Sequence, residues 1–288
     1  MLWVLVMKLA LGTVQFGLNY GISNSNGQVY IDEVDKILRF AHSVGISVLD
    51  TASTYGESEK ILGTVKSDDF DIITKTTKWS NEKSVEDNLH DFDKAFSLSK
   101  QNLHRNNLYG LLFHESNDLL GSNGKSLWAW AEKLKETNEI KKLGVSVYYP
   151  EQVKKILDLY KVDIVQLPLN VLDQRFLSLL PLLKERHIEI YVRSVFLQGL
   201  LLMEPNKIDP YFNEILPLLK SLPTPRLEFL LNFVKNNEFV DKILVGVTSL
   251  KDLEQIHQAY LSSPDQYNYS DYAILDERFI LPMNWSRK

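Results

Sequence analysis

The sequence predicts a parallel α/β protein, and the number of its strands favours a closed (β/α)8 barrel, the TIM-barrel fold, in a single domain. Apolar runs of strand length alternate with segments of helical periodicity along most of the chain. These runs are almost continuously apolar, as expected for parallel strands that are covered on both faces. A length of 288 residues also suits one barrel of about 250 residues with extensions.

Eight apolar runs are predicted to be strands, and each is followed by a polar cluster. They cover residues 8–12, 47–52, 70–75, 108–114, 142–147, 164–169, 189–196 and 242–248. Residues 1–6 either extend the first strand or precede a start at Met7. The beginning of the chain has no basic segment, no small-residue cleavage site and far fewer than the ~20 apolar residues that span a bilayer. We therefore expect a cytoplasmic protein that has no membrane partner.

Segments with apolar residues at steps of three and four predict the helices between these strands. Residues 31–44 form one such segment, and Gly45 follows at the position where a helix often ends in a left-handed residue. Pro150 suits the first turn of another helix. Ser249, with Asp252 three residues later, predicts a capped helix start. The remaining helices are predicted around residues 84–103, 127–137, 177–186 and 226–237.

A doubly wound sheet is the alternative arrangement of such elements. It is disfavoured because the first strand runs into G-T-V-Q-F-G rather than the G-x-G-x-x-G dinucleotide fingerprint. No Pro/Gly/Ser-rich linker divides the chain, so we expect one domain over residues 1–288, with the barrel at about 7–260 and a C-terminal tail at 261–288. The longest connections, 18–30 and 198–225, follow the first and seventh strands at the face where barrel active sites lie.

The composition excludes several kinds of function. The chain has 32 basic and 37 acidic residues and a net charge of −5, so it offers no general cationic surface to nucleic acid. The absence of cysteine excludes disulfides and thiolate metal sites. Of the six histidines only His114 ends a predicted strand, and no H-x-H or H-x-x-x-H pair is present, so no metal site is expected.

Three consecutive strand ends carry Asp50, Lys75 and His114, and Tyr55 follows the first of them. The carboxyl ends of barrel strands converge on one mouth, so we expect these four side chains to lie together. A single strand-end lysine or histidine is more often structural, by about three to one. Together, however, a lysine favours the phenolate form of a nearby tyrosine, a histidine shares its proton or orients a carbonyl, and an aspartate holds the lysine charged. The set predicts a phenol with a tunable pKa that acts on a carbonyl group.

Short motifs occur at seven of the predicted strands, in the order L-G-T-V-Q-F-G, L-D-T-A-S-T-Y-G-E-S-E, I-T-K, L-F-H, L-G-V-S, Q-L-P-L-N and V-G-V-T-S. In these motifs and their order, residues 8–260 resemble the aldo-keto reductases, a family of (β/α)8-barrel oxidoreductases that use NAD(P)H. The opening L-G-T-V-Q-F-G-L-N-Y-G-I is similar to a bacterial subgroup associated with sugar and surface-polysaccharide pathways. The resemblance therefore implies a small carbonyl substrate that is polar or derived from a sugar.

The resemblance also implies roles for individual residues. Tyr55 would be the general acid that protonates the carbonyl oxygen, Lys75 and Asp50 would lower and hold its pKa, and His114 would orient the substrate carbonyl. The implied contacts with the nicotinamide cofactor are Ser146, Gln166, Asn170, Arg193, Ser194, Gly246, Thr248 and Ser249. The last three lie at a helix start, where free amides and the helix dipole independently favour a phosphate.

Several positions depart from the family pattern. Val147 stands where many members have an asparagine that contacts the nicotinamide. Arg193 replaces an aromatic residue that stacks on the nicotinamide, and its guanidinium would either stack there or pair with a phosphate. Asp252 stands where an arginine often binds the 2′-phosphate of NADP(H), beside Lys251, and Ile256 replaces a frequent asparagine. The resemblance still favours NADP(H), with NAD(H) as the alternative.

The substrate pocket is predicted to be rimmed by residues from the loops and the tail. These residues are Gln15, Phe16, Trp79, Tyr148 and Trp285. Packing beneath loops is an equally frequent use of such aromatic side chains.

Two other functions remain open at this point. Lys75 at a strand end could form a Schiff base in a lyase, although Asp50 would keep it charged. The barrel could instead be a nicotinamide-binding regulatory module with weak catalysis, as the changes at Val147, Arg193 and Asp252 would allow. The sequence is compatible with a monomer and with a homo-oligomer.

Overall fold

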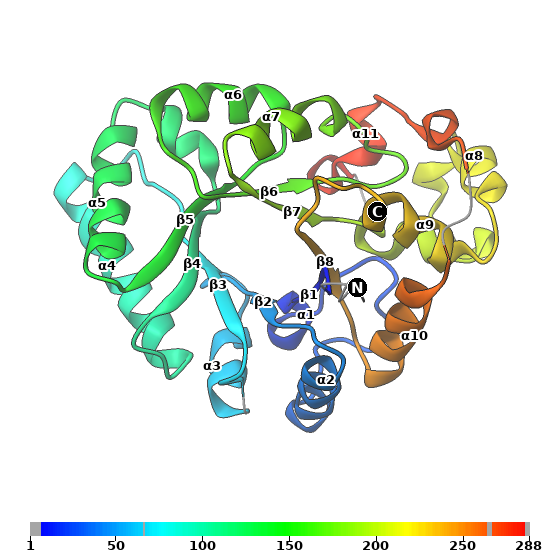
Figure 1. Cartoon of the computed structure of the whole chain (residues 1–288), viewed down its shortest axis with the longest axis horizontal. Helices are drawn as coiled ribbons and strands as arrows, with labels where there is room; N and C mark the ends of the chain where they lie inside the picture. The colour runs from blue at the N-terminus through cyan, green and yellow to red at the C-terminus, as the bar shows by residue number, and fades with distance from the viewer. Residues whose placement is uncertain (1–6, 66, 264–266, 286–288) are drawn as a thin grey trace, which may run out of the picture.

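The computed structural model describes residues 7–65, 67–263 and 267–285 and is a closed barrel of eight parallel strands (Figure 1). Each strand pairs with its neighbours in chain order, and β1 pairs with β8 to close the sheet. The strands are β1 (Leu9–Gly12), β2 (Val48–Asp50), β3 (Asp71–Lys75), β4 (Leu108–Phe113), β5 (Ile140–Ser146), β6 (Ile164–Pro168), β7 (Glu189–Arg193) and β8 (Lys242–Gly246). The predicted fold class is confirmed. Residues 1–6, considered above as an extension of β1, lie outside the described residues.

All eight strands overlap the predicted apolar runs, with shifts at their ends. Gly12 pairs with both Asp50 and Gly246, so the carboxyl ends of β1, β2 and β8 lie at one level. β7 ends at Arg193 rather than at residue 196, because Ser194 has a φ of 59° and leaves the extended conformation.

The helices follow the strands and cover the outside of the barrel (Figure 1). They are α1 (Val14–Gly17), α2 (Ile31–Ser43), α3 (Ser58–Thr64), α4 (Val85–Asn102), α5 (Gly124–Glu136), α6 (Pro150–Leu159), α7 (Leu180–Glu185), α8 (Leu216–Ser221), α9 (Arg226–Lys235), α10 (Leu250–Leu261) and α11 (Glu277–Ile280). Three local predictions are confirmed: Gly45 has a φ of 83° after α2, Pro150 begins α6, and Ser249 caps α10. The short helices α1, α3, α8 and α11, of 4 to 7 residues, are not predicted because they hold too few turns for an amphipathic period.

An apolar core lies on each side of the sheet. The larger one fills the space between the strands and the surrounding helices. The smaller one fills the barrel interior with Ala10, Val48, Ile73, Leu112, Ile164, Tyr191 and Leu244. Near the amino ends of the strands, the hydroxyls of Tyr109 and Tyr191 donate to the Glu189 carboxylate at 2.9 and 3.2 Å. Because the interior is packed with side chains, space for a ligand is expected at the carboxyl end.

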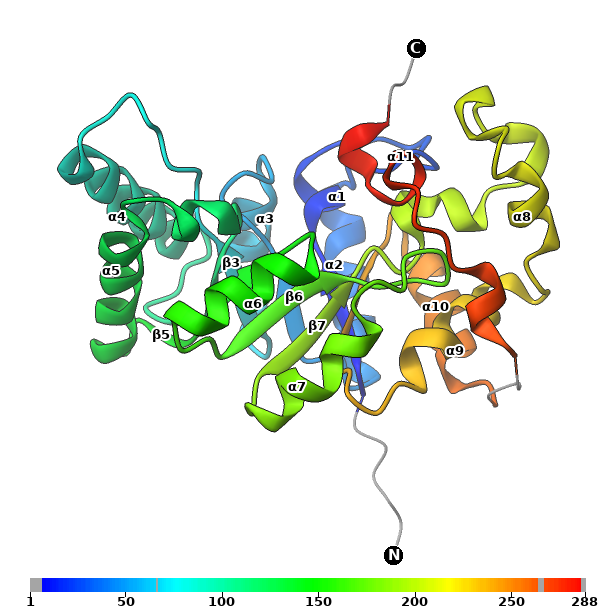
Figure 2. The same ribbon diagram turned by 90° about the horizontal axis from the view of Figure 1, so that it is seen from above.

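Long segments gather at the carboxyl end of the barrel. The loop after β1 and helix α11 lie at this same end (Figure 2). The loop after β1 is tied to the connection after β7 by a backbone hydrogen bond of 3.1 Å, which Ile22 donates to Gln198. Among the described helices, none has both the length and the apolar character needed to cross a membrane.

Candidate active site

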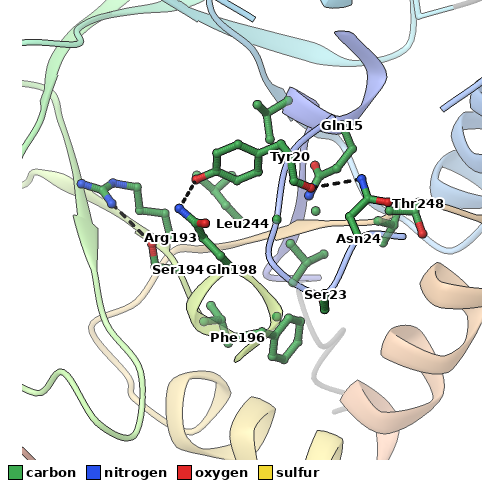
Figure 3. Close-up of a pocket in the computed structure, with 18 of the residues that line it drawn as sticks. Gln15, Tyr20, Ser23, Asn24, Arg193, Ser194, Phe196, Gln198, Leu244 and Thr248 are labelled. Carbon is green, nitrogen blue, oxygen red and sulfur yellow. Dashed lines mark hydrogen bonds between the residues drawn. The ribbon is translucent and has the colours of Figure 1, made fainter. Parts of the chain in front are cut away.

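A cavity of about 560 Å³ opens at the carboxyl end of the barrel. Residues that end or follow every strand except β3 contribute to its described lining. Arg193, at the end of β7, and Thr248, just before α10, lie on opposite sides of this space, with Gln15 and Tyr20 between them (Figure 3). The cavity therefore extends from the ends of the central strands to the start of α10.

The four residues that the sequence singled out come together at one side of this cavity. The Lys75 ammonium donates to Asp50 Oδ2 at 2.6 Å and to the carbonyl of Thr51 at 2.9 Å. It lies 5.0 Å from the centre of the Tyr55 ring. The rings of Tyr55 and His114 meet edge to face, with 6.0 Å between their centres. A phenol, an imidazole and a buried ion pair thus share one end of the cavity.

The pKa of Tyr55 is raised, whereas the sequence predicts that it is lowered. Burial raises the pKa of the Tyr55 phenol, and the negative charge of Asp50 raises it further, while the positive charge of Arg193 opposes both. Lys75 was expected to lower this pKa, but its charge is offset by Asp50 in the ion pair. Tyr55 therefore remains a protonated phenol at neutral pH, which is the form required of a proton donor.

His114 is held in its neutral form. Burial lowers the pKa of its imidazole to about 4, and the positive charges of Lys75 and Arg193 act in the same direction. A neutral imidazole keeps one N–H, which can donate to a carbonyl oxygen without carrying a charge. His114 lines the cavity beside Tyr55, so its ring faces the same space.

Lys75 is poorly placed for Schiff-base chemistry. Its side chain is buried beneath the cavity and pairs directly with Asp50. Burial lowers the pKa of Lys75, but the adjacent Asp50 carboxylate opposes this effect. The ion pair at 2.6 Å occupies the nitrogen and favours its ammonium form, whereas a lyase needs a free amine as the nucleophile. Among the described residues, no group of three or more histidines, cysteines, aspartates or glutamates could hold a metal ion.

Gln166 connects β6 to the ion pair. Its Nε2 donates to Asp50 Oδ1 at 2.7 Å, so both carboxylate oxygens of Asp50 have a donor. Gln166 lines the cavity beside Ser146, its partner in the register of β5 and β6. The amide oxygen of Gln166 and the hydroxyl of Ser146 are therefore groups that the wall can offer to a carboxamide.

Arg193 is fixed across the ends of β5 and β7. Its guanidinium lies 4.1 Å from the centre of the Tyr148 ring, and its Nη2 donates to the Val147 carbonyl at 2.9 Å. Asn170, predicted as a cofactor contact, does not line the cavity; its Nδ2 donates to the carbonyl of Ser194 at 3.1 Å. Asn170 thus supports the wall that Arg193 and Ser194 present to the cavity.

Gln15 offers an unsatisfied acceptor on the opposite wall. Its Oε1 is buried and has no hydrogen-bond partner among the described residues. A Cβ at Gly246 would lie 2.5 Å from Gln15 Nε2, so glycine is needed for the two to lie so close. An orphaned acceptor in a polar cavity indicates that a bound group completes the site. Gln15 on this wall and Gln166 and Ser146 on the other fit the amide and hydroxyl groups of a nicotinamide nucleotide.

At the start of α10, carboxylates of the chain itself accept hydrogen bonds from backbone amides. Asp252 Oδ2 accepts from the Thr248 amide at 2.9 Å and from its hydroxyl at 2.8 Å. Glu33, on α2, accepts from the Leu250 amide at 2.8 Å. Of the three residues predicted to meet a cofactor phosphate here, Gly246 and Thr248 line the cavity and Ser249 does not.

The residues predicted to rim the substrate pocket do not all line this cavity. Gln15 and Tyr148 line the cavity, whereas the described lining does not include Phe16, Trp79 or Trp285. Phe16 is fully buried in the core because α1 turns it inward. Trp79 packs on Phe92, with 6.2 Å between ring centres.

Trp285 was expected to close the mouth of the pocket. Instead it is 9% exposed, donates from its indole to the Phe279 carbonyl at 3.1 Å, and packs against Phe212. The C-terminal segment thus packs this tryptophan on the connection after β7, as part of the main apolar core.

Other cavity residues cannot be predicted from the sequence. Gln198 Nε2 donates to the Tyr20 hydroxyl at 3.0 Å, so the two long loops also meet through side chains (Figure 3). Gly199 lies so close to Ser23 that a Cβ there would be 1.8 Å from the serine hydroxyl. The sequence located both loops at the active-site face, but nothing in it indicates which residues meet between segments so far apart in the chain.

Comparison with known proteins identifies the family. The model of the Aldo/keto reductase family matches residues 8–277. The holo form of aldo-keto reductase AKR11C1 from Bacillus halodurans has a TM-score of 0.73 and 20% identity, covering 93% of this chain and 91% of that one. Glycerol dehydrogenase AKR11B4 from Gluconobacter oxydans has a TM-score of 0.66 and 18% identity, covering 92% of this chain and 90% of that one. No curated protein matches the sequence. Because the family model spans nearly the whole chain, the protein belongs to the aldo-keto reductase family.

Proposed function

We propose that the protein is an NAD(P)H-dependent reductase that converts a small aldehyde or ketone to the alcohol, with Tyr55 as the general acid. The observation that carries this proposal is a half-buried, protonated phenol that lines the cavity close to the Lys75–Asp50 ion pair and beside a neutral His114. Membership of an oxidoreductase family supports the same class of reaction.

Each residue of this group has a distinct task. The bound reduced nicotinamide would supply a hydride to the carbonyl carbon. Tyr55 donates its phenolic proton to the carbonyl oxygen, and the nearby ammonium of Lys75 stabilises the phenolate that remains. His114 donates its N–H to the same oxygen and thereby orients the carbonyl toward Tyr55. Asp50 holds the ammonium in place and is itself oriented by Gln166.

The cofactor would lie along the cavity with its nicotinamide beside Tyr55. Gln166 and Ser146 offer an amide oxygen and a hydroxyl to the carboxamide, and Gln15 offers its unpaired acceptor on the opposite wall. Arg193, stacked on Tyr148, is the cation nearest to this end. The family resemblance favours NADP(H), with NAD(H) as the alternative, and the choice depends on the charges at the other end of the cavity.

The substrate that fits this site best is a small, polar carbonyl compound. The mouth near Tyr55 carries the hydroxyl of Tyr20, the amide of Gln198 and the guanidinium of Arg193, all in the cavity lining. Such groups hydrogen-bond hydroxyls and carboxylates better than they bind alkyl chains. A sugar-derived aldehyde or ketone is consistent with this lining, and one structural relative is named a glycerol dehydrogenase.

The test is turnover with a panel of hydroxylated and plain aldehydes, followed through the absorbance of NADH and NADPH. We expect oxidation of one or both nucleotides that depends on the aldehyde, faster with the hydroxylated members. Borohydride treatment with the same aldehydes should leave no mass adduct on Lys75. An adduct without nucleotide oxidation would support the lyase instead, and tight nucleotide binding without any turnover would support a regulatory module.

A further inference from the structure

We propose that the cavity selects NAD(H) over NADP(H), and that Asp252, supported by Glu33, is the residue responsible. This inference rests on the proposed function, because it concerns the cofactor of that reaction. It reverses the preference that the family resemblance implies, and it follows from where the described carboxylates lie.

The orientation of the nucleotide follows from the chemistry. The nicotinamide must lie beside Tyr55 and His114, because the proton and the hydride go to one carbonyl group. Along the nucleotide, the pyrophosphate comes next and the adenosine ribose lies farther away. The far part of the described lining is formed by Thr248, Asp252 and Gln255, around the start of α10. The adenosine ribose, which carries the extra phosphate of NADP(H), therefore reaches this region.

This region is acidic. Asp252 lines the cavity and accepts from both donors of Thr248, which fixes its carboxylate at the cavity wall. Glu33 lies behind it and accepts from the Leu250 amide. That hydrogen bond, with the contribution of Lys36, lowers the pKa of Glu33, so this carboxylate is charged at neutral pH. Two amides at the start of α10 thus already bind carboxylates and are not free for a phosphate.

No cation in the described lining compensates for the charge of Asp252. Arg193 is the only lysine or arginine among the lining residues that the structure describes, and it lies on the side of the cavity opposite Thr248 (Figure 3). Lys36 already pairs with Glu33 at 3.1 Å. Lys251 is exposed and does not belong to the described lining.

The two cofactors differ in the 2′-group that would contact the carboxylates near the start of α10. The 2′-hydroxyl of NAD(H) can donate a hydrogen bond to a carboxylate, and a carboxylate is a strong acceptor for it. The 2′-phosphate of NADP(H) has no such donor at neutral pH and brings further negative charge. Like charges brought together in a partly buried site disfavour binding. We therefore expect NADH to bind at least about tenfold more tightly than NADPH.

The test is calorimetric titration of the protein with NADH and NADPH, and with ADP-ribose and its 2′-phosphorylated form. The two fragments lack the nicotinamide, so their difference reports the 2′-position alone and needs no turnover. Asp252→Asn keeps an oxygen that can accept from Thr248 and removes the charge. It should strengthen binding of the 2′-phosphorylated compounds by about tenfold and weaken NADH and ADP-ribose binding, because the amide is a poorer acceptor for the 2′-hydroxyl.

Glu254→Gln is the matched control, because it removes one charge from the exposed side of the same helix, outside the described lining. It should leave the ratio of NADH to NADPH affinity unchanged. Glu33→Gln should shift the ratio in the same direction as Asp252→Asn, which provides a second variant if the first fails to fold.

The outcomes separate the two proposals. Tighter binding of NADPH than of NADH would overturn the inference and leave the proposed reductase intact. A preference for NADH that neither Asp252→Asn nor Glu33→Gln alters would overturn the assignment to these carboxylates. If neither nucleotide binds, both the inference and the proposed function are wrong.

Discussion

The proposed chemistry depends on a single side chain, the phenol of Tyr55. Tyr55 is half-buried in the cavity wall, and its pKa is raised by desolvation and by Asp50, so the group enters the reaction as an acid. The Lys75–Asp50 pair is almost fully buried, with side-chain exposures of 1% and 6%. Removing either partner would leave an unpaired buried charge, which costs about 3 to 5 kcal/mol. A variant that lacks only one partner is therefore expected to be destabilised as well as impaired in catalysis.

His114 provides a prediction about pH. Its pKa is about 4 in the folded protein, below its ordinary value of 6.5. As the pH falls below 6.5, the unfolded chain takes up the proton first, so this contribution to stability is full above 6.5 and is lost on approaching 4. Between pH 7 and 4.5 the wild type should lose about 1 to 2 kcal/mol more stability than His114→Gln.

The measurement is urea unfolding of both proteins at each pH. His90→Gln, at an exposed position of α4, is the control and should follow the wild type. Equal losses of stability in wild type and His114→Gln would show that the imidazole is not held neutral by the fold.

Among the contacts between structural elements, the one between the loops after β1 and β7 is expected to retain the cofactor. Gly199 has a φ of 92°, and a Cβ there would lie 1.8 Å from the Ser23 hydroxyl and 2.7 Å from its Cβ. Gly199→Ala should therefore separate the two loops. We expect bound NADH to dissociate about tenfold faster, measured by stopped-flow fluorescence.

Gly27→Ala is a matched control for this substitution. Gly27 has a φ of 77° in the loop after β1, but no atom lies within 4 Å of the position of its added Cβ. It should cost about 1 kcal/mol in stability through backbone strain and leave the dissociation rate unchanged. Similar dissociation rates for the two variants would mean that the loop contact does not retain the cofactor.

The strands and loops of the barrel show which features can be predicted from the sequence and which cannot. Strand order, the barrel and the group around Tyr55 could be predicted, because continuous apolar runs define strands and parallel strands bring their carboxyl ends together. The roles of Phe16 and Trp285 could not be predicted, because an aromatic side chain in a loop packs inward or lines a cavity according to local turns. Nor does any pattern connect Glu33 with Leu250, which lie far apart in the chain and meet only in the folded barrel.

For the whole molecule, the cavity joins strand ends around most of the ring. Residues at or after seven of the eight strands line it, so a ligand there contacts nearly the entire barrel. Cofactor binding should stabilise the barrel as a unit, by about 2.7 kcal/mol at a free concentration one hundred times Kd.

A stabilisation of about 2.7 kcal/mol corresponds to a rise in Tm of about 5 °C, which thermal unfolding at increasing cofactor concentration would detect. A Tm that does not move at a concentration where titration shows saturation would contradict binding in this cavity.

The most direct test of the central claim is single-turnover oxidation of bound NADH or NADPH by an aldehyde, in wild type and in Tyr55→Phe. Removing the proton donor should slow this step by about 10²- to 10⁴-fold and leave the affinity for the nucleotide nearly unchanged. Tyr30→Phe, at a residue that is 84% exposed, should react at the wild-type rate. A Tyr55→Phe protein that retains most of the wild-type rate would contradict the assignment of Tyr55 as the general acid.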